Sequence, residues 1–300
     1  MPFSAEPDYY SIVIGVLAGV LARFYLLRVD YRQYPSYPHG YISHLFLGLV
    51  AAGLGAVAIP ALLKKDYVAV TFLALAAQQF REIRSMERET LMQLDRTELV
   101  PRGSDYIEGI ARVFEARNYI VMGVALVVSA TVHFSQPVYG VVVALVAIFA
   151  ASWMIPGELV GDIARVELAE IEFQGPLMVI GGVVMMNVGL IQHREKILKE
   201  GLGAVIHPND DNARATLDNI GQRQAIMHVA ASLLGTKREI SEQEFSPLAR
   251  KHIDTGCLSI FLLPNEPDRE LLPIAIRRTP LLESSKRKPL STQVGRKAAD

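Results

Sequence analysis

The sequence predicts a mainly α-helical protein, with a multi-pass membrane domain of about six spans followed by a small α/β soluble domain. Long apolar blocks carry few charges in the first two thirds of the chain, whereas most charged residues lie between them. The mean hydropathy of +0.26 is positive for a chain of 300 residues. After residue 192 the long blocks give way to shorter mixed segments, which predicts the soluble domain.

Six apolar blocks are the predicted spans: residues 12–27, 42–63, 67–80, 119–134, 138–155 and 177–191. The second block contains two small-xxx-small pairs, Gly48–Ala52 and Ala52–Ala56, which let helices approach closely in lipid. The third block is short for a bilayer and ends in two glutamines. It is therefore either a span that emerges into water or an amphipathic helix on the membrane surface.

Residues 101–119 follow the rules of an amphipathic helix that leads into a span. Asp105 is the expected N-cap, and Glu108 can reach back to it. Glu108 and Arg112 are four residues apart and can pair on one face. We therefore predict a membrane domain over residues 1–195, with amphipathic helices around residues 80–118 and 157–175.

One tetrapeptide occurs twice in the predicted membrane domain. The letters IARV stand at residues 110–113 and again at residues 163–166. Either a duplicated helix-and-span segment or chance explains this echo.

The region over residues 196–283 has the pattern of a compact α/β domain. Apolar runs bounded by Gly and Pro predict strands, and residues with helical periodicity predict helices. The expected order is a strand at 201–208, a long helix at 210–235, a short helix at 246–256, and strands at 257–264 and 271–279. The last segment, residues 284–300, is polar and basic and is predicted to be disordered.

The distribution of Lys and Arg predicts which side each loop faces. The loop between the third and fourth blocks is rich in arginine, so it is expected on the cytosolic side with the N-terminus outside. Basic residues also follow the sixth block, so the sequence does not decide on which side of the membrane the C-terminal domain lies.

Polar side chains inside the blocks suggest one alternative function. Gln78, Gln79, Thr131 and Asn187 would line a channel or transporter if they faced one another. Side chains of these types more often bridge neighbouring helices. No acidic residue or histidine lies centrally in a block, as a proton relay would require.

The soluble domain offers weak candidates for chemistry. His207, His228 and Cys257 would form a catalytic or metal group only if the fold brought them together, because none lies at ligand spacing. Cys257 follows a glycine and precedes an apolar run, as a small buried residue does. We therefore predict no catalytic residue, no metal site and no cofactor. Gln222, Arg223 and His228 are either a partner surface or the solvated face of a helix.

Composition excludes further classes. The formal net charge is −1, which gives no basic field for nucleic acid. The chain has one cysteine, so it forms no internal disulfide.

The string YIEGIA at residues 106–111 resembles the signature of the YIEGIA family of membrane proteins from spore-forming bacteria. The strings QQFREIRSMERETL at residues 78–91 and GQRQAI at residues 221–226 are also similar to this family. The resemblance implies a role in the spore or its membrane, and a small companion protein described as a capping complex subunit. It implies no catalytic or binding residues.

These observations predict a non-enzymatic membrane subunit of a complex, whose C-terminal domain docks a small partner. The expected partners are the lipid bilayer, the companion capping subunit and a further copy of the chain, and not nucleic acid. The expected location is the cell membrane, including the forespore or spore membrane. The candidate interface residues are Glu108, Arg112, Gln222, Arg223 and His228. A channel or transporter for ions or small solutes is the alternative.

Overall fold

The computed structural model describes residues 7–30, 34, 40–153, 157–239 and 242–298. The chain divides into two compact units. The helical unit comprises Met1–Leu91 and Ile110–Pro156, and the α/β unit comprises Met92–Gly109 and Gly157–Asp300. The divisions fall inside two helices, so the N-terminal turns of the helix that carries YIEGIA belong to the α/β unit.

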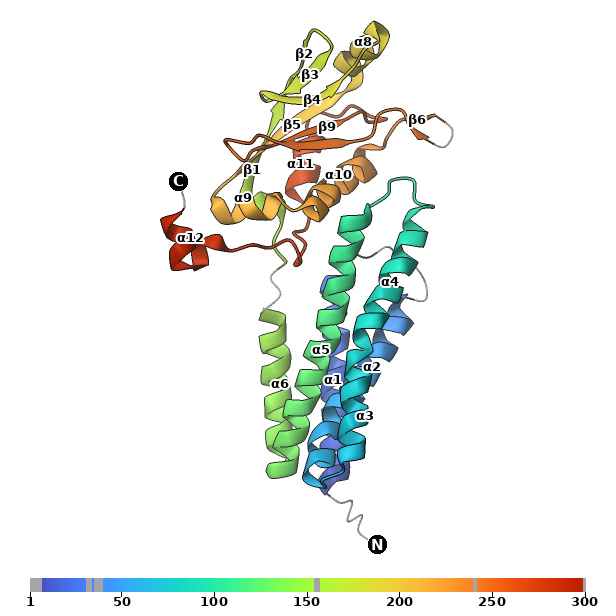
Figure 1. Cartoon of the computed structure of the whole chain (residues 1–300), viewed down its shortest axis with the longest axis vertical. Coiled ribbons are helices and arrows are strands. Elements are labelled where there is room, and N and C mark those ends of the chain that lie inside the picture. Colours follow the sequence, from blue (N-terminus) through green and yellow to red (C-terminus); the bar gives the residue numbers. More distant parts are fainter. Residues whose placement is uncertain (1–6, 31–33, 35–39, 154–156, 240–241, 299–300) are drawn as a thin grey trace. The chain divides into compact units, whose positions relative to one another are not determined.

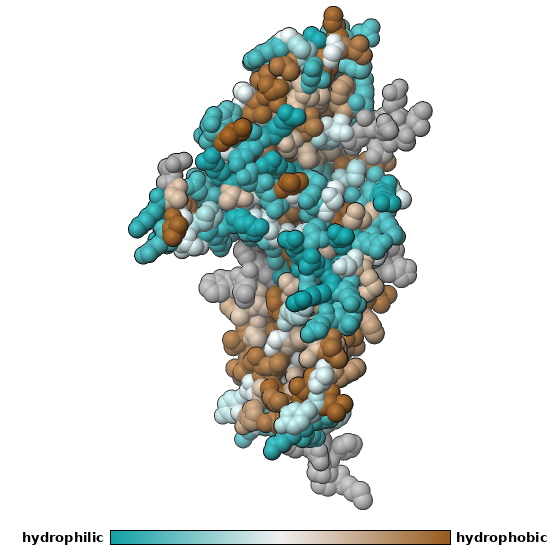
Figure 2. All heavy atoms as spheres, in the orientation of Figure 1, coloured by the Kyte–Doolittle hydropathy of each residue, from teal (hydrophilic) through white to brown (hydrophobic). Residues whose placement is uncertain are grey.

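The helical unit consists of long helices (Figure 1). Its elements are α1 (Pro7–Asp30), α2 (Gly40–Leu63), α3 (Tyr67–Gln78), α4 (Phe80–Asp95), α5 (Ser104–Phe134) and α6 (Pro137–Trp153). Within the described residues, three segments are long and apolar enough to cross a bilayer: Asp8–Arg28, Gly40–Leu63 and Ser104–Phe134. The α6 helix is apolar but shorter. Figure 2 shows apolar side chains gathered on the outside of these helices, as lipid contact requires.

Six spans are therefore not found in the described chain. The predicted span at residues 177–191 and the predicted amphipathic helix at 157–175 were wrong, because these residues form strands. They are β1 (Ala164–Ala169), β2 (Ile171–Gln174), β3 (Leu177–Ile180) and β4 (Val183–Asn187), after the short helix α7 (Val160–Ile163). Gly181 and Gly182 have φ values of 55° and 78°, which favour the tight turn of a hairpin over a continuous helix.

Small residues on α2 bring helices close together, as the small-xxx-small pairs predicted. The Ala52 and Ala56 side chains are fully buried. A Cβ atom at Gly48 would lie 2.5 Å from the Cγ atom of Arg23, and one at Gly55 would lie 2.1 Å from the Met122 carbonyl oxygen. Larger side chains at these glycines would therefore separate α2 from its neighbours.

The α/β unit is built on antiparallel sheets. A four-stranded sheet has the order β1-β5-β9-β8, with β5 (Leu202–Pro208), β8 (Leu248–Lys251) and β9 (Leu258–Leu262). A three-stranded sheet has the order β2-β3-β4. The remaining elements are α8 (Ile191–Glu200), α9 (Asp211–Leu217), α10 (Ile220–Leu234), β6 (Arg238–Glu239), β7 (Glu242–Gln243), α11 (Leu271–Arg277), the 3-10 turn η1 (Pro289–Ser291) and α12 (Gln293–Lys297).

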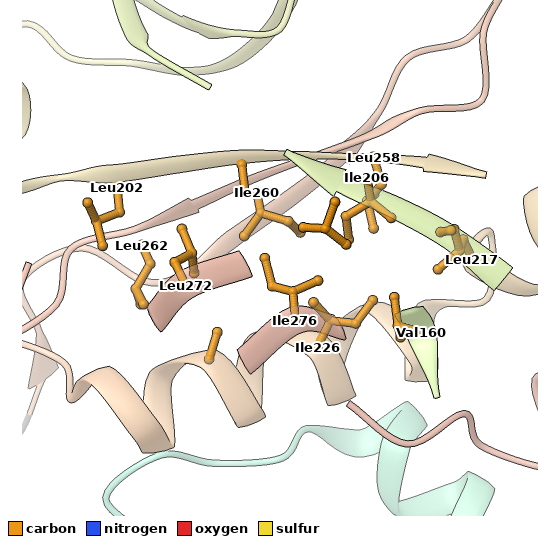
Figure 3. Packing of buried hydrophobic residues seen from close by; sticks show 14 of the residues in the cluster. Val160, Leu202, Ile206, Leu217, Ile226, Leu258, Ile260, Leu262, Leu272 and Ile276 are labelled. Atoms are coloured by element: carbon orange, nitrogen blue, oxygen red, sulfur yellow. The ribbon is translucent and has the colours of Figure 1, made fainter. Parts of the chain in front are cut away.

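The core follows the alternation of side chains along the central strands (Figure 3). Leu202 and Ile206 of β5 point towards α10 and α11, where Ile226 and Ile276 meet them. Val205 points to the opposite face and packs with residues of β3 and β4. The four-stranded sheet is thus apolar on both faces, with helices on one side and the smaller sheet on the other.

The structure confirms some predicted elements of this unit and corrects others. The strand at 201–208 and the strand around 257–264 are found as β5 and β9. The long helix at 210–235 is two helices, α9 and α10, and Gly235 follows the second as predicted. The predicted helix at 246–256 contains the strand β8, and the predicted strand at 271–279 is the helix α11.

The unit boundaries also differ from the predicted domains. The α/β unit consists of residues 92–109 and residues 157–300, whereas the predicted α/β domain began at residue 196. The predicted amphipathic helix over 80–118 is interrupted between α4 and α5. The tail beyond residue 284, predicted to be disordered, holds η1 and α12 and is attached through a bond from the Leu290 amide to the Asn212 Oδ1 atom at 3.0 Å.

Candidate functional site

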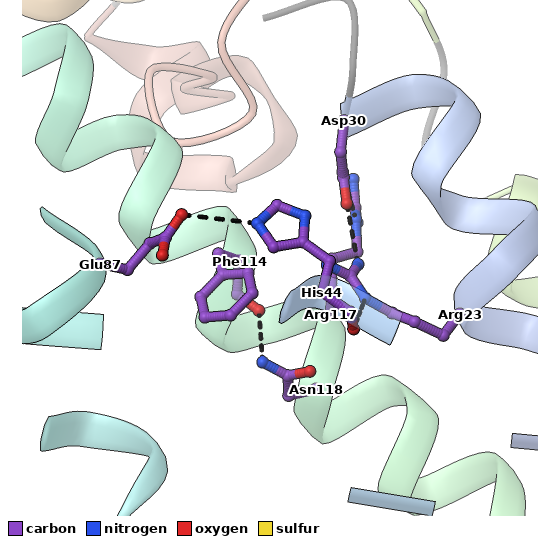
Figure 4. A network of polar contacts seen from close by, with 7 residues as sticks. All are labelled: Arg23, Asp30, His44, Glu87, Phe114, Arg117 and Asn118. Atoms are coloured by element: carbon purple, nitrogen blue, oxygen red, sulfur yellow. Dashed lines mark hydrogen bonds and ion pairs between the residues drawn. The ribbon is translucent and has the colours of Figure 1, made fainter. Parts of the chain in front are cut away.

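A buried ionic cluster joins α1 to α5 in the helical unit (Figure 4). The Asp30 carboxylate accepts hydrogen bonds from the Arg23 Nη1 atom at 2.8 Å and from the Arg117 Nε atom at 3.1 Å. The exposed fractions of the three side chains are 0%, 2% and 2% for Arg23, Asp30 and Arg117. One carboxylate therefore neutralises parts of two guanidinium groups away from water.

His44 and Glu87 extend the cluster to α2 and α4. The Arg23 Nε atom donates to the His44 carbonyl oxygen at 3.4 Å. The His44 Nε2 atom lies 3.4 Å from the Glu87 Oε1 atom, which brings a second carboxylate to the cluster. Four helices of the unit are thus tied together by polar contacts.

An aromatic ring of α5 completes the packing. The Arg23 guanidinium carbon lies 5.7 Å from the centre of the Phe114 ring, within the range of a cation–π contact. The His44 ring lies 4.8 Å from the same ring. The Asn118 side chain donates to the Phe114 carbonyl oxygen at 3.1 Å. Arg23 and Asp30 are therefore each held by more than one partner, so the cluster fixes the positions of the helices.

A second polar site lies in the α/β unit, where α10 meets the first turn of α5. The Gln224 Oε1 atom accepts hydrogen bonds from the backbone amides of Asp105 and Tyr106 at 3.0 and 2.9 Å. These amides open a helix and have no partner within it. Gln224 therefore caps α5 from another helix, in place of the predicted Asp105 cap. The strings YIEGIA and GQRQAI meet at this point.

Close backbone contact tightens the same junction. A Cβ atom at Gly221 would lie 2.7 Å from the Asp105 carbonyl oxygen. The loop before α5 is fixed by the Asp95 carboxylate, which accepts from the backbone amides of Arg102 and Gly103 at 2.7 and 3.1 Å. The α/β unit thus holds both the end of α4 and the start of α5.

Gln222 is fully buried and holds the segment that follows α11. Its Oε1 atom accepts from the Leu282 amide at 2.8 Å and from the Ser285 hydroxyl at 3.0 Å. Its Nε2 atom donates to the Pro280 carbonyl oxygen at 3.2 Å. The side chain is therefore a structural bridge within the unit.

The predicted interface residues are mostly engaged inside the protein. Arg223 donates to the Leu217 carbonyl oxygen and pairs with Asp218. Gln222 is buried and His228 is half-buried, because α10 packs the sheet with one face and α5 with another. Gln222 is therefore not available to a partner, whereas an interface role for Arg223 and His228 stays a prediction. On α5, Glu108 is half-buried and Arg112 is exposed.

His228 makes the stability of the α/β unit depend on pH. Burial lowers the pKa of its imidazole from the ordinary value of 6.5, and the positive charge of Arg102 lowers this pKa further. The unfolded chain then binds a proton at a higher pH than the folded unit does. Stability is therefore expected to fall as the pH drops below 6.5, until the folded pKa is passed.

The measurement is the unfolding temperature of the full chain between pH 7.5 and pH 5.5, a range that starts above the ordinary histidine pKa of 6.5 and extends below it. Hydrogen exchange at each pH identifies the protection of the α/β unit. The decrease is expected to be smaller in His228→Leu than in the native chain. An equal decrease in both proteins would show that another group causes the pH dependence.

The four polar residues of the channel alternative are not brought together. Gln78 and Gln79 are exposed at the join of α3 and α4. Thr131 bonds to the Val127 carbonyl oxygen of its own helix at 2.8 Å. Asn187 is the last residue of β4 and belongs to the α/β unit, so it was wrongly placed in a span. No observation on these residues favours a channel.

The three candidate catalytic or metal-binding residues, His207, His228 and Cys257, lie in two separate places. The Cys257 Sγ atom lies 3.3 Å from the His207 Nδ1 atom, and Cys257 is half-buried. His228 instead faces the Tyr106 ring, with 6.1 Å between the ring centres. In the described part of the chain, no group of three or more His, Cys, Asp and Glu side chains could hold a metal ion.

None of the charged residues of the ionic cluster was singled out from the sequence as a candidate site residue. These residues are Arg23, Asp30, His44, Glu87 and Arg117. Arg23 and Asp30 are seven residues apart on one helix, which places them two turns apart on the same face. That spacing was a usable signal, whereas the contributions of α2, α4 and α5 depend on the tertiary structure.

Comparison with known proteins agrees with the resemblance in the motifs. The model of the YIEGIA protein family matches residues 11–292. A protein of Bacillus subtilis (strain 168), designated Uncharacterized protein YphB, is 44% identical over 283 residues, which cover 94% of this chain and 95% of that protein. No solved structure matches the chain. Since the family match spans most of the sequence, including the Gln224 junction and the ionic cluster, the chain belongs to the YIEGIA family.

Proposed function

We propose that this protein is a non-enzymatic integral membrane subunit of a complex, and that its α/β unit docks a small partner protein on α8. The apolar helices of the helical unit would anchor the subunit in the membrane. The family context supports a membrane of a spore-forming cell and a small companion subunit as the partner.

The observation that carries this proposal is an exposed apolar face on α8, which we call the α8 face. Leu190, Ile191 and Leu198 have exposed fractions of 61%, 68% and 56%. Ile191 and Leu198 are seven residues apart and so share one side of the helix, whereas Ile197 packs into the core. Grouped apolar side chains on a unit that already has a complete core are typical of a protein interaction site.

The start of the α8 face is held firmly. Arg194 donates to three carbonyl oxygens, those of Val188 at 2.7 Å, Gly189 at 2.9 Å and Gly175 at 3.1 Å. These bonds attach the first turn of α8 to the β2–β3 turn and to the end of β4. A partner would therefore meet a surface that is ordered before binding, which lowers the entropic cost of association.

A cavity lies beside the other end of this face. It has a volume of about 210 Å³, and Leu198 lines it together with Leu168, Ile171, Pro267 and Arg269. Glu170, Lys199 and Arg269 also line the cavity, and Arg269 pairs with Glu170. A cavity with both apolar and charged lining next to exposed leucine and isoleucine side chains can receive a side chain of a partner.

The double substitution Leu190→Glu with Ile191→Glu tests the proposal. We expect it to reduce recovery of the companion subunit with the tagged full chain from sporulating cells by about tenfold or more, because charges would replace a buried apolar contact. The matched control is Ile253→Glu, since Ile253 is 86% exposed in the same unit but lies outside the α8 face. Equal recovery with the double variant and the control would contradict docking on α8.

A further inference from the structure

Cys257, His207 and Glu167 lie in a row on one face of the four-stranded sheet. The Cys257 Sγ atom is 3.3 Å from the His207 Nδ1 atom. The opposite nitrogen of the same ring, Nε2, is 3.7 Å from the Glu167 Oε2 atom. A thiol, an imidazole and a carboxylate therefore follow one another in contact.

Strand register brings these three residues together. His207 on β5 pairs with Arg165 of β1, and Glu167 is two residues further along β1, so its side chain points to the same face. Ile206 pairs with Leu258 of β9, which places Cys257 beside His207 at the next position. Cys257 packs with Val205 and Phe261 and therefore lies on the same face of the sheet as these two residues. Because the residues come from paired strands, their spacing is fixed by the sheet.

The groups around His207 determine which of its ring nitrogens carries the proton. The Arg165 Nε atom holds one Glu167 oxygen at 2.9 Å, and the other oxygen faces the His207 ring. A carboxylate beside Nε2 favours the tautomer with hydrogen on Nε2, which leaves the lone pair of Nδ1 directed at Cys257. His207 can then accept the thiol proton, with Glu167 as a positioning residue.

The sulfur is also within reach of small molecules. Cys257 is half-buried, and the His207 side chain is 37% exposed. The thiolate, and not the thiol, is the nucleophile in exchange with disulfides. The chain has no second cysteine, so no internal thiol can resolve an adduct at this position.

We propose that Cys257 is a reactive thiol, activated by His207, that forms mixed disulfides with low-molecular-weight disulfides. His207 Nδ1 accepts the thiol proton, and the Cys257 thiolate attacks one sulfur of the disulfide. The new S–S bond forms as the old one breaks, and the leaving thiolate takes up a proton from the imidazolium. Cys257 is oxidised, one half of the small disulfide is reduced to a thiol, and no other reactant is consumed. A second small thiol reverses the modification.

The test is the second-order rate constant for reaction of the purified full chain with the neutral disulfide dithiodipyridine. His207→Gln removes the base that takes up the thiol proton, so it is expected to lower the rate constant by about tenfold. His252→Gln is the matched control. His252 and Cys257 lie in one turn, between β8 and β9, and the His252 backbone amide donates to the Cys257 carbonyl oxygen at 2.8 Å. This control is expected to react at the native rate. Glu167→Gln is expected to give an intermediate rate.

Several outcomes would overturn the proposal. One is a native protein that does not react, and another is a rate that His207→Gln leaves unchanged. Equal losses in His207→Gln and His252→Gln would show that the turn, and not the imidazole, controls the thiol. Hydrogen exchange of β5 reports whether each variant is folded, and His207→Asn replaces the glutamine variant if that variant is not.

Discussion

Asp30→Ala is expected to destabilise the helical unit by about 3–5 kcal/mol, the cost of removing one partner from a buried ion pair. The substitution leaves Arg23 and Arg117 buried without their shared acceptor. Neither guanidinium group can lose its charge, since arginine stays protonated in proteins. We therefore expect a large loss of folded protein in detergent and a clear decrease in unfolding temperature.

Two further variants test whether the buried charges cause this loss of stability. Lys64→Ala breaks an ion pair with Asp8 in which the lysine side chain is 60% exposed, so it is expected to cost at most about 1 kcal/mol. The triple variant Arg23→Met, Asp30→Leu and Arg117→Met removes all three charges and is expected to recover most of the stability. If Asp30→Ala unfolds at the same temperature as Lys64→Ala, the cluster does not hold the helices together.

Gln222→Leu is expected to destabilise the α/β unit by on the order of 3 kcal/mol, because several buried polar groups lose their partner. The Leu282 amide, the Ser285 hydroxyl and the Pro280 carbonyl oxygen all bond to this side chain. Hydrogen exchange of the full chain should show faster exchange at residues 280–285 and in α10.

The matched control is Gln192→Leu, which changes an exposed glutamine on α8 of the same unit. This control is expected to leave exchange at residues 280–285 unchanged. Native protection in Gln222→Leu would mean that the buried bridge contributes little, and that the segment after α11 is held by its apolar contacts alone.

The apolar helices could be predicted because their signal lies within each helix. Length and composition identify α1, α2 and the second half of α5 directly. Length and apolar composition gave a wrong prediction at residues 177–191, because two short strands and the turn between them have the total length of a span. Gly181 and Gly182 in the middle of that run were the available sign of a hairpin.

The two IARV segments show why local sequence is insufficient. Residues 110–113 lie within α5, whereas residues 163–166 end α7 and begin β1. Identical residues are helical in one place and extended in the other because their neighbours in space differ. This difference argues against a duplicated helix-and-span segment.

The α11 helix could have been predicted from its first turn. Asp268 accepts from the amides of Glu270 and Leu271 at 2.8 and 3.0 Å, and Pro273 lies where a proline is tolerated in a helix. The run of Leu and Ile in this segment is also typical of a buried strand, which is why the sequence predicts a strand here. The Gln224 cap could not be predicted in this way, because 118 residues separate Gln224 from Tyr106.

Site-specific photo-crosslinking from the α8 face tests the central claim most directly. A photoreactive residue at position 191 of the otherwise native chain would be activated in sporulating cells, with position 253 as the control, because both side chains are exposed and lie in the same unit. Docking on α8 predicts a discrete crosslinked product with the small companion subunit from position 191 and none from position 253. No product from position 191, or the same product from both positions, would contradict the proposal that this subunit docks its partner on α8.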